Sequence, residues 1–232
     1  MSSGFVIAID GPAGTGKSTV ARRVARALHA GYLDTGAMYR IVTLAVLRAS
    51  VDPADDAAVA ALLPRLRFES PTNAARQEHR LDGDRVTTEI RGSTVTFAVT
   101  PVSANPAVRA FLLERQRLLA RSGRMVVEGR DIGTVVVPDA DLKIYLTADA
   151  AERARRRHRQ NGALVGGAPT GDLGSELAAV ATDLHRRDSK DSSRTHAPLQ
   201  AAADAVVVDS SELAVEETVA RVLALAAERG IS

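Results

Sequence analysis

The sequence predicts an α/β fold in which helices cover both faces of a parallel β-sheet. Short apolar runs of strand length alternate along the chain with longer segments that repeat apolar residues every three or four positions. This alternation is typical of a parallel sheet, because each parallel connection carries a helix across one face. The 232 residues, 45% of them hydrophobic and 25% charged, suffice for one domain with insertions and a substantial core.

The first strand is predicted at residues 5–9, an apolar run (FVIAI) that ends at Asp10 and a glycine-proline pair. A helix is predicted over 16–30, because apolar residues follow one another there at four-residue spacing. A second short strand at 32–33 leads into a second helix, which apolar residues mark along one face between positions 38 and 49.

The pattern changes over 62–100, where the helical period is lost. Asp82 and Gly83 lie there between two short alternating runs, which is the signal of a β-hairpin with a two-residue turn. We therefore expect a small β-rich unit inserted into the main fold, followed by a helix over 106–121.

The C-terminal half returns to alternating strands and helices. Apolar runs of strand length occupy 125–127, 142–146 and 205–208. Helices are predicted over 149–160, 175–187 and 215–226, with Ser175 as a candidate N-cap. Residues 161–174 are rich in glycine, alanine and proline, and we expect a loop there.

Residues 11–18 fit the phosphate-loop pattern G-x-x-x-x-G-K-[ST], with a predicted strand before them and a predicted helix after them. The backbone N–H groups of such a loop can surround a phosphate, and the dipole of the following helix adds to the attraction. Lys17 can reach the β- and γ-phosphates, and the Ser18 hydroxyl can bind Mg²⁺. The predicted ATP-binding residues are Gly11, Pro12, Ala13, Gly14, Thr15, Gly16, Lys17, Ser18 and Thr19.

GTPases, motor ATPases and small-molecule kinases share such a loop, so it does not by itself define the function. The sequence lacks the N-K-x-D run of a translation GTPase and is short for a motor. It has no cysteine and no apolar run of transmembrane length, and its N-terminus is unlike a signal peptide. A net charge of +2 and 3% aromatic residues, with no tryptophan, do not favour single-stranded nucleic acid as a partner.

Three further segments carry a resemblance to a known family. They read LDTGAMYR at 33–40, EGRDIGT at 128–134, and RD, D and R at positions 187–188, 191 and 194. Together with the phosphate loop they resemble the bacterial cytidylate kinases over residues 5–225. The resemblance implies a P-loop nucleoside-monophosphate kinase fold with a five-stranded parallel sheet flanked by helices. It assigns 1–61 and 106–232 to this core, about 155–187 to a lid within it, and 62–105 to a monophosphate-binding insert with a small β-rich unit.

The resemblance also implies which residues act on the substrates. Asp131 would accept a hydrogen bond from the cytosine amino group, Arg109 would donate to the ring, and Thr35 would place a hydroxyl beside them. The ribose would fall to Asp191, Arg187 and Thr100, and the phosphate of CMP to a clamp of arginines. The implied CMP-binding residues are Thr35, Arg40, Thr100, Arg109, Arg130, Asp131, Arg187, Asp191 and Arg194. The implied catalytic residues are Lys17, Arg130, Arg187 and Arg194.

Several of these residues have a structural alternative. For Mg²⁺, Ser18 is the predicted direct ligand, and Asp34 and Glu128 would act through water; Asp34 could instead cap the helix that follows it. Asp131 could cap its own helix or pair with Arg130. The five arginines within 153–159 form either an exposed helical face or part of a lid in which two or three of them touch ATP.

We therefore predict a cytoplasmic enzyme that transfers the γ-phosphoryl group of MgATP to CMP or dCMP. Its predicted partners are these small molecules, with no nucleic acid, no membrane and no second subunit. Two alternatives stay open: another small-molecule P-loop kinase, acting on UMP, AMP or shikimate, and a non-catalytic module that binds nucleic acid through the arginine-rich helix.

Overall fold

The computed structural model describes residues 4–165, 172–194 and 197–232. Its main sheet has five parallel strands in the order β2-β6-β1-β7-β8. These are β1 (Val6–Asp10), β2 (Gly31–Asp34), β6 (Met125–Glu128), β7 (Leu142–Thr147) and β8 (Val206–Asp209). The central strand β1 places Ile7 beside Val126 of β6 on one side and beside Leu142 of β7 on the other. The predicted α/β fold with its five-stranded parallel sheet is confirmed.

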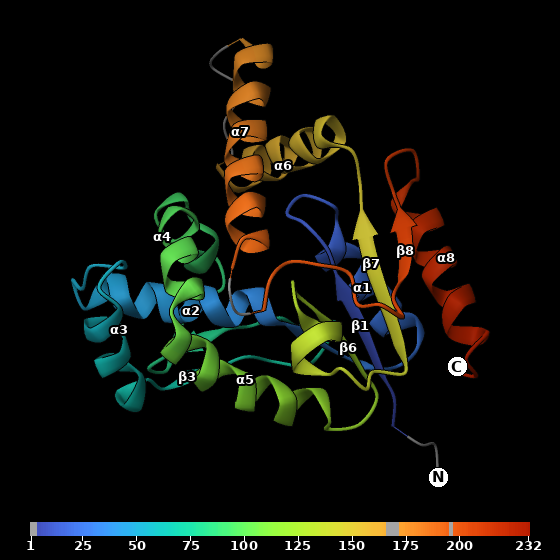
Figure 1. The fold of residues 1–232 in the computed structure, drawn as a ribbon, viewed down its shortest axis with the longest axis horizontal. Coiled ribbons are helices and arrows are strands. Elements are labelled where there is room, and N and C mark those ends of the chain that lie inside the picture. Colours follow the sequence, from blue (N-terminus) through green and yellow to red (C-terminus); the bar gives the residue numbers. More distant parts are fainter. Residues whose placement is uncertain (1–3, 166–171, 195–196) are drawn as a thin grey trace.

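Helices surround this sheet and extend beyond it. They are α1 (Lys17–Ala27), α2 (Thr35–Arg48), α3 (Asp56–Leu62), α4 (Ser93–Ala104), α5 (Pro106–Ala120), α6 (Ala150–Val165), α7 (Leu173–Ser192) and α8 (Val215–Ala227). Three short turns of helix are η1 (Leu63–Arg65), η2 (Glu89–Arg91) and the π-helix η3 (Ile132–Val136). Figure 1 shows α6 and α7 beyond the carboxyl ends of β7 and β8, with α3 and α4 on the opposite side of the molecule from α8.

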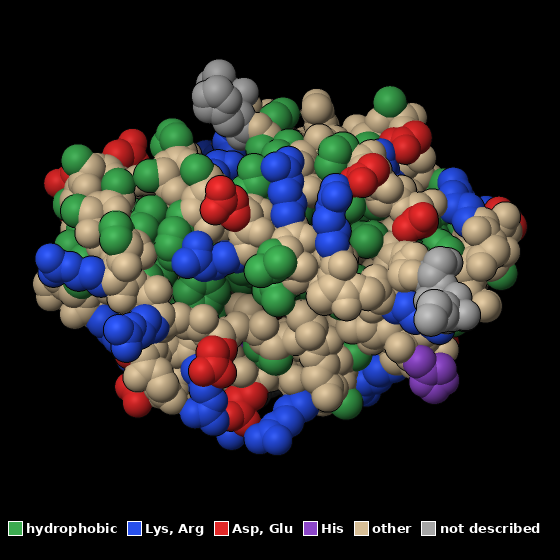
Figure 2. All heavy atoms as spheres, turned by 90° about the horizontal axis from the view of Figure 1, so that it is seen from below, with side chains coloured by type: hydrophobic (Ala, Val, Ile, Leu, Met, Phe, Trp, Pro, Cys, Tyr) green, Lys and Arg blue, Asp and Glu red, His purple; other side chains and the backbone are tan. Residues whose placement is uncertain are grey.

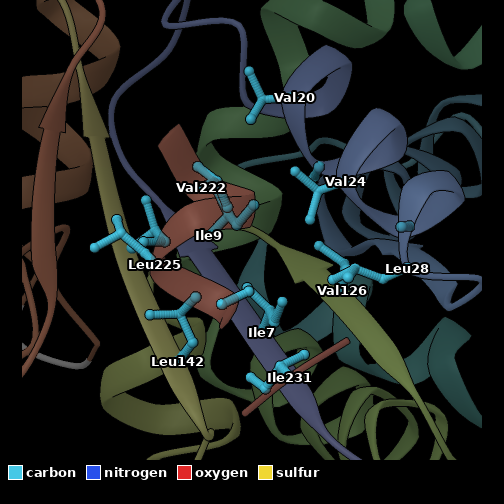
Figure 3. Packing of buried hydrophobic residues seen from close by; sticks show 14 of the residues in the cluster. Ile7, Ile9, Val20, Val24, Leu28, Val126, Leu142, Val222, Leu225 and Ile231 are labelled. Carbon is cyan, nitrogen blue, oxygen red and sulfur yellow. The ribbon is translucent and has the colours of Figure 1, made fainter. Parts of the chain in front are cut away.

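Alternate residues of the strands pack against different helical layers. Ile7 and Ile9 of β1 share a cluster with Val24 of α1 and Leu225 of α8, as Figure 3 shows. Ala8 faces the other way, into a second cluster that α2 and α5 supply. Successive side chains of a strand point to opposite faces, so both faces of the sheet are covered and buried.

The insert holds a second, antiparallel sheet of three two-residue strands, β3 (Phe68–Glu69), β4 (Arg80–Leu81) and β5 (Asp84–Arg85). Asp82 and Gly83 join β4 to β5 with φ angles of 51° and 90°, the positive values that a two-residue hairpin turn of this kind requires. The predicted hairpin is therefore confirmed.

The expected loss of helical structure up to position 100 is wrong for its last part, because Ser93–Ala104 forms α4. Its sequence, STVTFAVTPVSA, is rich in β-branched residues and contains Pro101, features that disfavour a helix in isolation. Tertiary packing outweighs this preference: Val95 lies in a cluster with α2 and β4, and Val102 lies in one with α2 and α5.

The predicted loop over 161–174 is also shorter than expected. Helix α6 continues to Val165, and α7 begins at Leu173; residues 166–171 lie outside the described part of the chain. The N-cap of α7 is Asp172 rather than Ser175, since the Asp172 carboxylate accepts from the Ser175 N–H at 3.0 Å. Among the described residues, no helix has both the length and the apolarity to span a bilayer.

One pair of substitutions in α5 tests this packing. Leu112 is fully buried and Leu118 is 75% exposed, so the same change at both positions isolates the effect of burial. Leu112→Ala is expected to lower the free energy of unfolding by about 2–5 kcal/mol through lost burial and a residual cavity. Leu118→Ala is expected to change it by less than about 0.5 kcal/mol. Urea denaturation of both variants measures the difference, and equal losses would contradict the described packing of α5.

Candidate active site

A cleft of about 540 Å³ opens where β1, β2 and β6 end, and helices α4, α6 and α7 form its other walls. It gathers residues that lie far apart in the sequence. Of the predicted site residues, only Gly11 and Pro12 do not line it. Those that do are Ala13, Gly14, Thr15, Gly16, Lys17, Ser18, Thr19, Asp34, Thr35, Arg40, Thr100, Arg109, Glu128, Arg130, Asp131, Arg187, Asp191 and Arg194.

The phosphate loop connects β1 to α1 and needs glycine at two positions in particular. A Cβ on Gly11 would meet the Leu146 carbonyl oxygen at 2.0 Å, so no larger residue fits there. Gly16, just before α1, has a φ of 90°, in the left-handed region. Gly11 and Pro12 do not line the cleft, but each contacts a residue that does. The Gly11 carbonyl oxygen accepts from Arg130 at 3.1 Å, and the Pro12 carbonyl oxygen accepts from Lys17 at 2.6 Å.

The Lys17 side chain is buried and folds back onto its own loop. Its Nζ donates to the Pro12 carbonyl and, at 3.5 Å, to the Thr15 hydroxyl. Burial lowers the pKa of this ammonium group, and the charge of Arg130 lowers it further. Within the described chain Lys17 forms no ion pair, so an anion bound in the loop would stabilise its charged form.

Two acids lie beside the loop on neighbouring strands. Glu128, at the end of β6, accepts a hydrogen bond from the Tyr32 hydroxyl and lines the cleft together with Ser18. Asp34, at the end of β2, caps α2 by accepting from the Ala37 N–H at 2.8 Å, and it pairs with Arg91 at 3.0 Å. The alternative role of Asp34 as a helix cap is therefore confirmed. Burial raises the pKa of Glu128, and the negative charge of Asp34 raises it further.

This arrangement fits a magnesium ion. The Ser18 hydroxyl and the carboxylates of Asp34 and Glu128 supply oxygen donors, and the repulsion between the two carboxylates is one that a divalent cation relieves. No cluster of three or more His, Cys, Asp or Glu side chains able to hold a metal occurs in the described residues. Mg²⁺ in phosphate-transfer sites usually keeps several waters and phosphate oxygens, so one direct protein ligand is consistent with it.

The predicted base-reading residues come together at one end of the cleft. Asp131 forms an ion pair with Arg109, and both side chains are largely buried. Asp131 therefore neither caps the helix that follows it nor pairs with Arg130, the two alternatives that the sequence left open. The Thr35 hydroxyl lies nearby on the cleft wall and donates to the Glu128 carbonyl at 2.7 Å.

Asp191 organises the arginines that the sequence assigned to the phosphate. Its carboxylate pairs with Arg130 at 3.0 Å through one oxygen and with Arg194 through the other. Arg194 also donates to the Ser103 hydroxyl at 2.9 Å, which connects the end of α7 to α4. Both arginines are thus held in place before any ligand binds.

Three arginines that line the cleft form no ion pair with any described residue, namely Arg40, Arg157 and Arg187. Among the described residues Arg40 donates to two neutral acceptors, the Ile90 carbonyl at 3.0 Å and the Thr96 hydroxyl at 2.8 Å. Burial, with the charges of Arg187 and Arg157, lowers the pKa of Arg40 to about 9. These clustered cations have no ion-pair partner in the described part of the chain, an arrangement that would favour an anion here.

The structure separates the five arginines of α6. Arg156, Arg157 and Arg159 line the cleft, whereas Arg153 and Arg155 do not. Arg153 pairs with Asp188, and Glu152 accepts from Arg155 and Arg156 at 2.9 Å each. Three of these arginines, Arg155, Arg156 and Arg159, share the single carboxylate of Glu152, so the positive charge of α6 is only partly compensated within the described residues. Figure 2 shows the face of the molecule away from α6 and α7, where acidic and basic side chains are interspersed rather than gathered into one basic patch.

Sequence reasoning missed several residues that shape the cleft. Arg91, which pairs with Asp34, belongs to a stretch without any recognisable motif. Asp188 accepts from the Ala13 N–H at 3.0 Å. Only the presence of Asp188 beside Arg187 in the third motif offered a signal. Asp10, which follows the first strand directly, was read as the end of that strand and nothing more.

The parallel sheet, the phosphate loop and the arginine-lined cleft at the strand ends define a P-loop phosphotransferase. A family model described as cytidylate kinase matches residues 7–228. The chain belongs to the cytidylate kinase family.

Individual relatives agree with this. The cytidylate kinase of Rhodococcus opacus is 53% identical over 229 residues, which cover 98% of this chain and 97% of that protein. The cytidylate kinase of Mycolicibacterium paratuberculosis is 54% identical over 214 residues, covering 92% and 91%. The crystal structure of an uncharacterized protein from Eubacterium ventriosum matches with a TM-score of 0.51 at 11% identity, over 95% of this chain and 97% of that one. The last likeness concerns the fold alone.

The uncompensated arginines predict a strong response to a polyanion. Inorganic pyrophosphate at about 100 times its Kd is expected to raise the free energy of unfolding by about 2.7 kcal/mol, while chloride at equal ionic strength should not. Arg187→Met should reduce this gain, and Arg221→Met, at an exposed position of α8, should leave it unchanged. Thermal melts of the three proteins measure it, and an equal gain in all three would place the anion elsewhere.

Proposed function

We propose that this protein transfers the γ-phosphoryl group of ATP to CMP or dCMP and releases ADP with CDP or dCDP. One observation carries the proposal: a single cleft joins the phosphate loop to the Asp131–Arg109 pair, with uncompensated arginines in the same walls. Membership of the cytidylate kinase family supports it. We further infer a cytoplasmic enzyme that acts as a monomer on these small molecules.

The phosphate loop would bind the donor. Its N–H groups and the start of α1 surround the β- and γ-phosphates, and the arriving charge draws Lys17 away from the Pro12 carbonyl. A bound Mg²⁺ would supply positive charge that offsets the negative charge of the donor's phosphates. Ser18 would bind this ion directly, with Asp34 and Glu128 orienting its water.

The transfer step needs little covalent chemistry from the protein. An oxygen of the CMP phosphate forms a bond to the γ-phosphorus, and the bond from that phosphorus to the β–γ bridging oxygen breaks, so ADP departs with the electron pair. The attacking phosphate is already an anion, and no protein base is required. We propose that the negative charge that develops during transfer is stabilised by Lys17, Arg130, Arg187 and Arg194. Arg40 would join these arginines in binding the phosphate of CMP.

The base would be read by the Asp131–Arg109 pair. Cytosine presents an amino donor beside a ring acceptor, whereas uracil presents a carbonyl beside an N–H donor. A carboxylate and a guanidinium match cytosine and oppose uracil. Asp191, Arg187 and Thr100 would contact the ribose. We further propose that 62–105 acts as the monophosphate-binding part and that about 155–187 acts as a lid.

A coupled assay that follows ADP release tests the proposal directly. ATP is offered with CMP, dCMP, UMP, AMP or shikimate in turn. Phosphorylation of CMP and dCMP with the highest kcat/KM is the expected result. Faster turnover of UMP, AMP or shikimate would overturn it in favour of another small-molecule kinase.

Removal of the loop cation is expected to disable transfer without unfolding the protein. Lys17→Ala should lower kcat about 100-fold or more, because a preorganised electrostatic contact of this kind is commonly worth about 3–4 kcal/mol. Lys190→Ala removes the same charge from an exposed position of α7 and should keep kcat within about twofold. Circular dichroism verifies the fold of both variants. A near-normal kcat for Lys17→Ala would remove this lysine from the transfer step.

The base-reading role makes a separate prediction. Asp131→Asn should weaken CMP and narrow its lead over UMP, because an amide can present either a donor or an acceptor. Two mismatched polar contacts at about 1–3 kcal/mol each give the native site a preference for CMP of about 100-fold or more. The measurement is kcat/KM for CMP and UMP on both proteins. An unchanged ratio would show that Asp131 does not read the base.

A further inference from the structure

Asp10 is a buried acid that the proposed mechanism leaves without a role. It is the last residue of β1, directly before the phosphate loop, and its side chain is 5% exposed. Its two carboxylate oxygens accept from the N–H groups of Ile132 and Gly133, each at 2.8 Å. The carboxylate thus ties the end of the central strand to a segment more than a hundred positions further along the chain.

The two N–H groups are the first of the π-helix η3. The opening N–H groups of a helix have no partner within it, and the side chain of the preceding residue usually accepts from one of them. Asp131 stands at that preceding position and is a residue type well suited to the task, yet its side chain makes no capping hydrogen bond. Asp10 supplies the cap from a different strand.

Because Asp10 makes the capping hydrogen bonds, the Asp131 carboxylate does not have to make them. This carboxylate turns instead to Arg109 and lines the cleft. Pairing with Arg109 competes with a second arrangement, in which the Asp131 carboxylate accepts from the Gly133 N–H. A carboxylate at this position can readily accept from the N–H two residues onward. With Asp10 in place, that N–H is already occupied.

We propose that Asp10 is a positioning residue for base selection: it caps η3 in place of Asp131, and so keeps the Asp131 carboxylate directed at the cleft. The inference rests on the proposed role of Asp131 in reading cytosine. Asp10 itself does not touch the substrate.

The surroundings of Asp10 suit this role. Burial raises the pKa of Asp10 to about 6, so near pH 8 the group is ionised and both oxygens accept. The backbone of η3 lies close to the sheet, since a Cβ on Gly133 would meet the Lys143 Cδ at 3.1 Å. Lys143 pairs with Asp204 at 2.8 Å, which leaves the two N–H groups as the direct partners of Asp10 among the described residues.

Asp10→Asn tests the proposal because it keeps the shape of the side chain and turns one acceptor into a donor. One N–H of η3 then faces an amide NH₂ group, and the Asp131 carboxylate becomes its alternative partner. We expect the ratio of kcat/KM for CMP to that for UMP, measured at pH 8, to fall about 10-fold or more, as for loss of one buried polar contact. The KM for ATP should stay within about threefold, because the ATP-binding N–H groups are not involved.

A double-mutant cycle separates positioning from general damage. If Asp10 acts through Asp131, adding Asp10→Asn to Asp131→Asn should change the CMP/UMP ratio by less than about twofold. Asp141→Asn is the matched control. Its carboxylate accepts from the Val6 N–H at 2.8 Å at the opposite end of the same strand, and this variant should keep the native ratio.

Each outcome decides the question. An unchanged CMP/UMP ratio in Asp10→Asn, or a KM for ATP that rises as much as that for CMP, would overturn the proposal. Full additivity in the cycle would also overturn it. If Asp10→Asn does not fold, Gly133→Ala disturbs the same hydrogen bond from the η3 side, and a native ratio in that variant would refute it. A native protein without CMP kinase activity would instead refute the proposed function.

Discussion

The site depends on one constraint, the parallel alignment of β2, β6 and β1. In this register Glu128 lies beside Asp34 on one side and beside Ile9 on the other, so the three strands end at the same level. The phosphate loop, the two acids and the segment that carries Asp131 therefore open at one edge of the sheet. The same constraint forces ionisable groups into a crowded, partly dry place, where burial raises the pKa of Glu128 and lowers that of Lys17.

The charges of the cleft are balanced unevenly. Asp131 pairs with Arg109, and the single carboxylate of Asp191 pairs with both Arg130 and Arg194, so these side chains are held in position in the free protein. The remaining cations, Arg40, Arg157 and Arg187, are half-buried in the same cleft, and partial burial lowers the pKa of Arg187, with Arg130 lowering it further. An entering phosphate relieves this repulsion. The part of the cleft with the strongest repulsion between its own charges is thus the part that an anionic ligand would stabilise most.

The sequence predicted correctly those parts of the fold that depend on interactions between residues close together in the chain. The strands, the hairpin at Asp82 and the phosphate loop follow from apolar runs and turn chemistry within a few residues. Helix α4 was missed because its stability comes from contacts with α2 and α5, against its own propensity. The sequence could not separate the three roles open to Asp131, namely reading the base, capping its own helix and pairing with Arg130. The residue that caps η3 in its place is Asp10 of β1, far away in the chain. Arginines could be assigned to the cleft by motif, but their pairing with particular acids depends on the fold.

Arg153 and Asp188 form an ion pair between α6 and α7, and both side chains also hydrogen-bond to the backbone of the phosphate loop. The Ala13 N–H donates to Asp188 at 3.0 Å, and the Ala13 carbonyl accepts from Arg153 at 3.1 Å. Either charge alone would be left buried against the loop at a cost of several kcal/mol, about 3–5 kcal/mol in comparable cases. A change at either position alone would therefore disturb three parts of the protein at once, the two helices and the turn between β1 and α1. The ion pair thus couples the conformation of α6 and α7 to that of the phosphate loop.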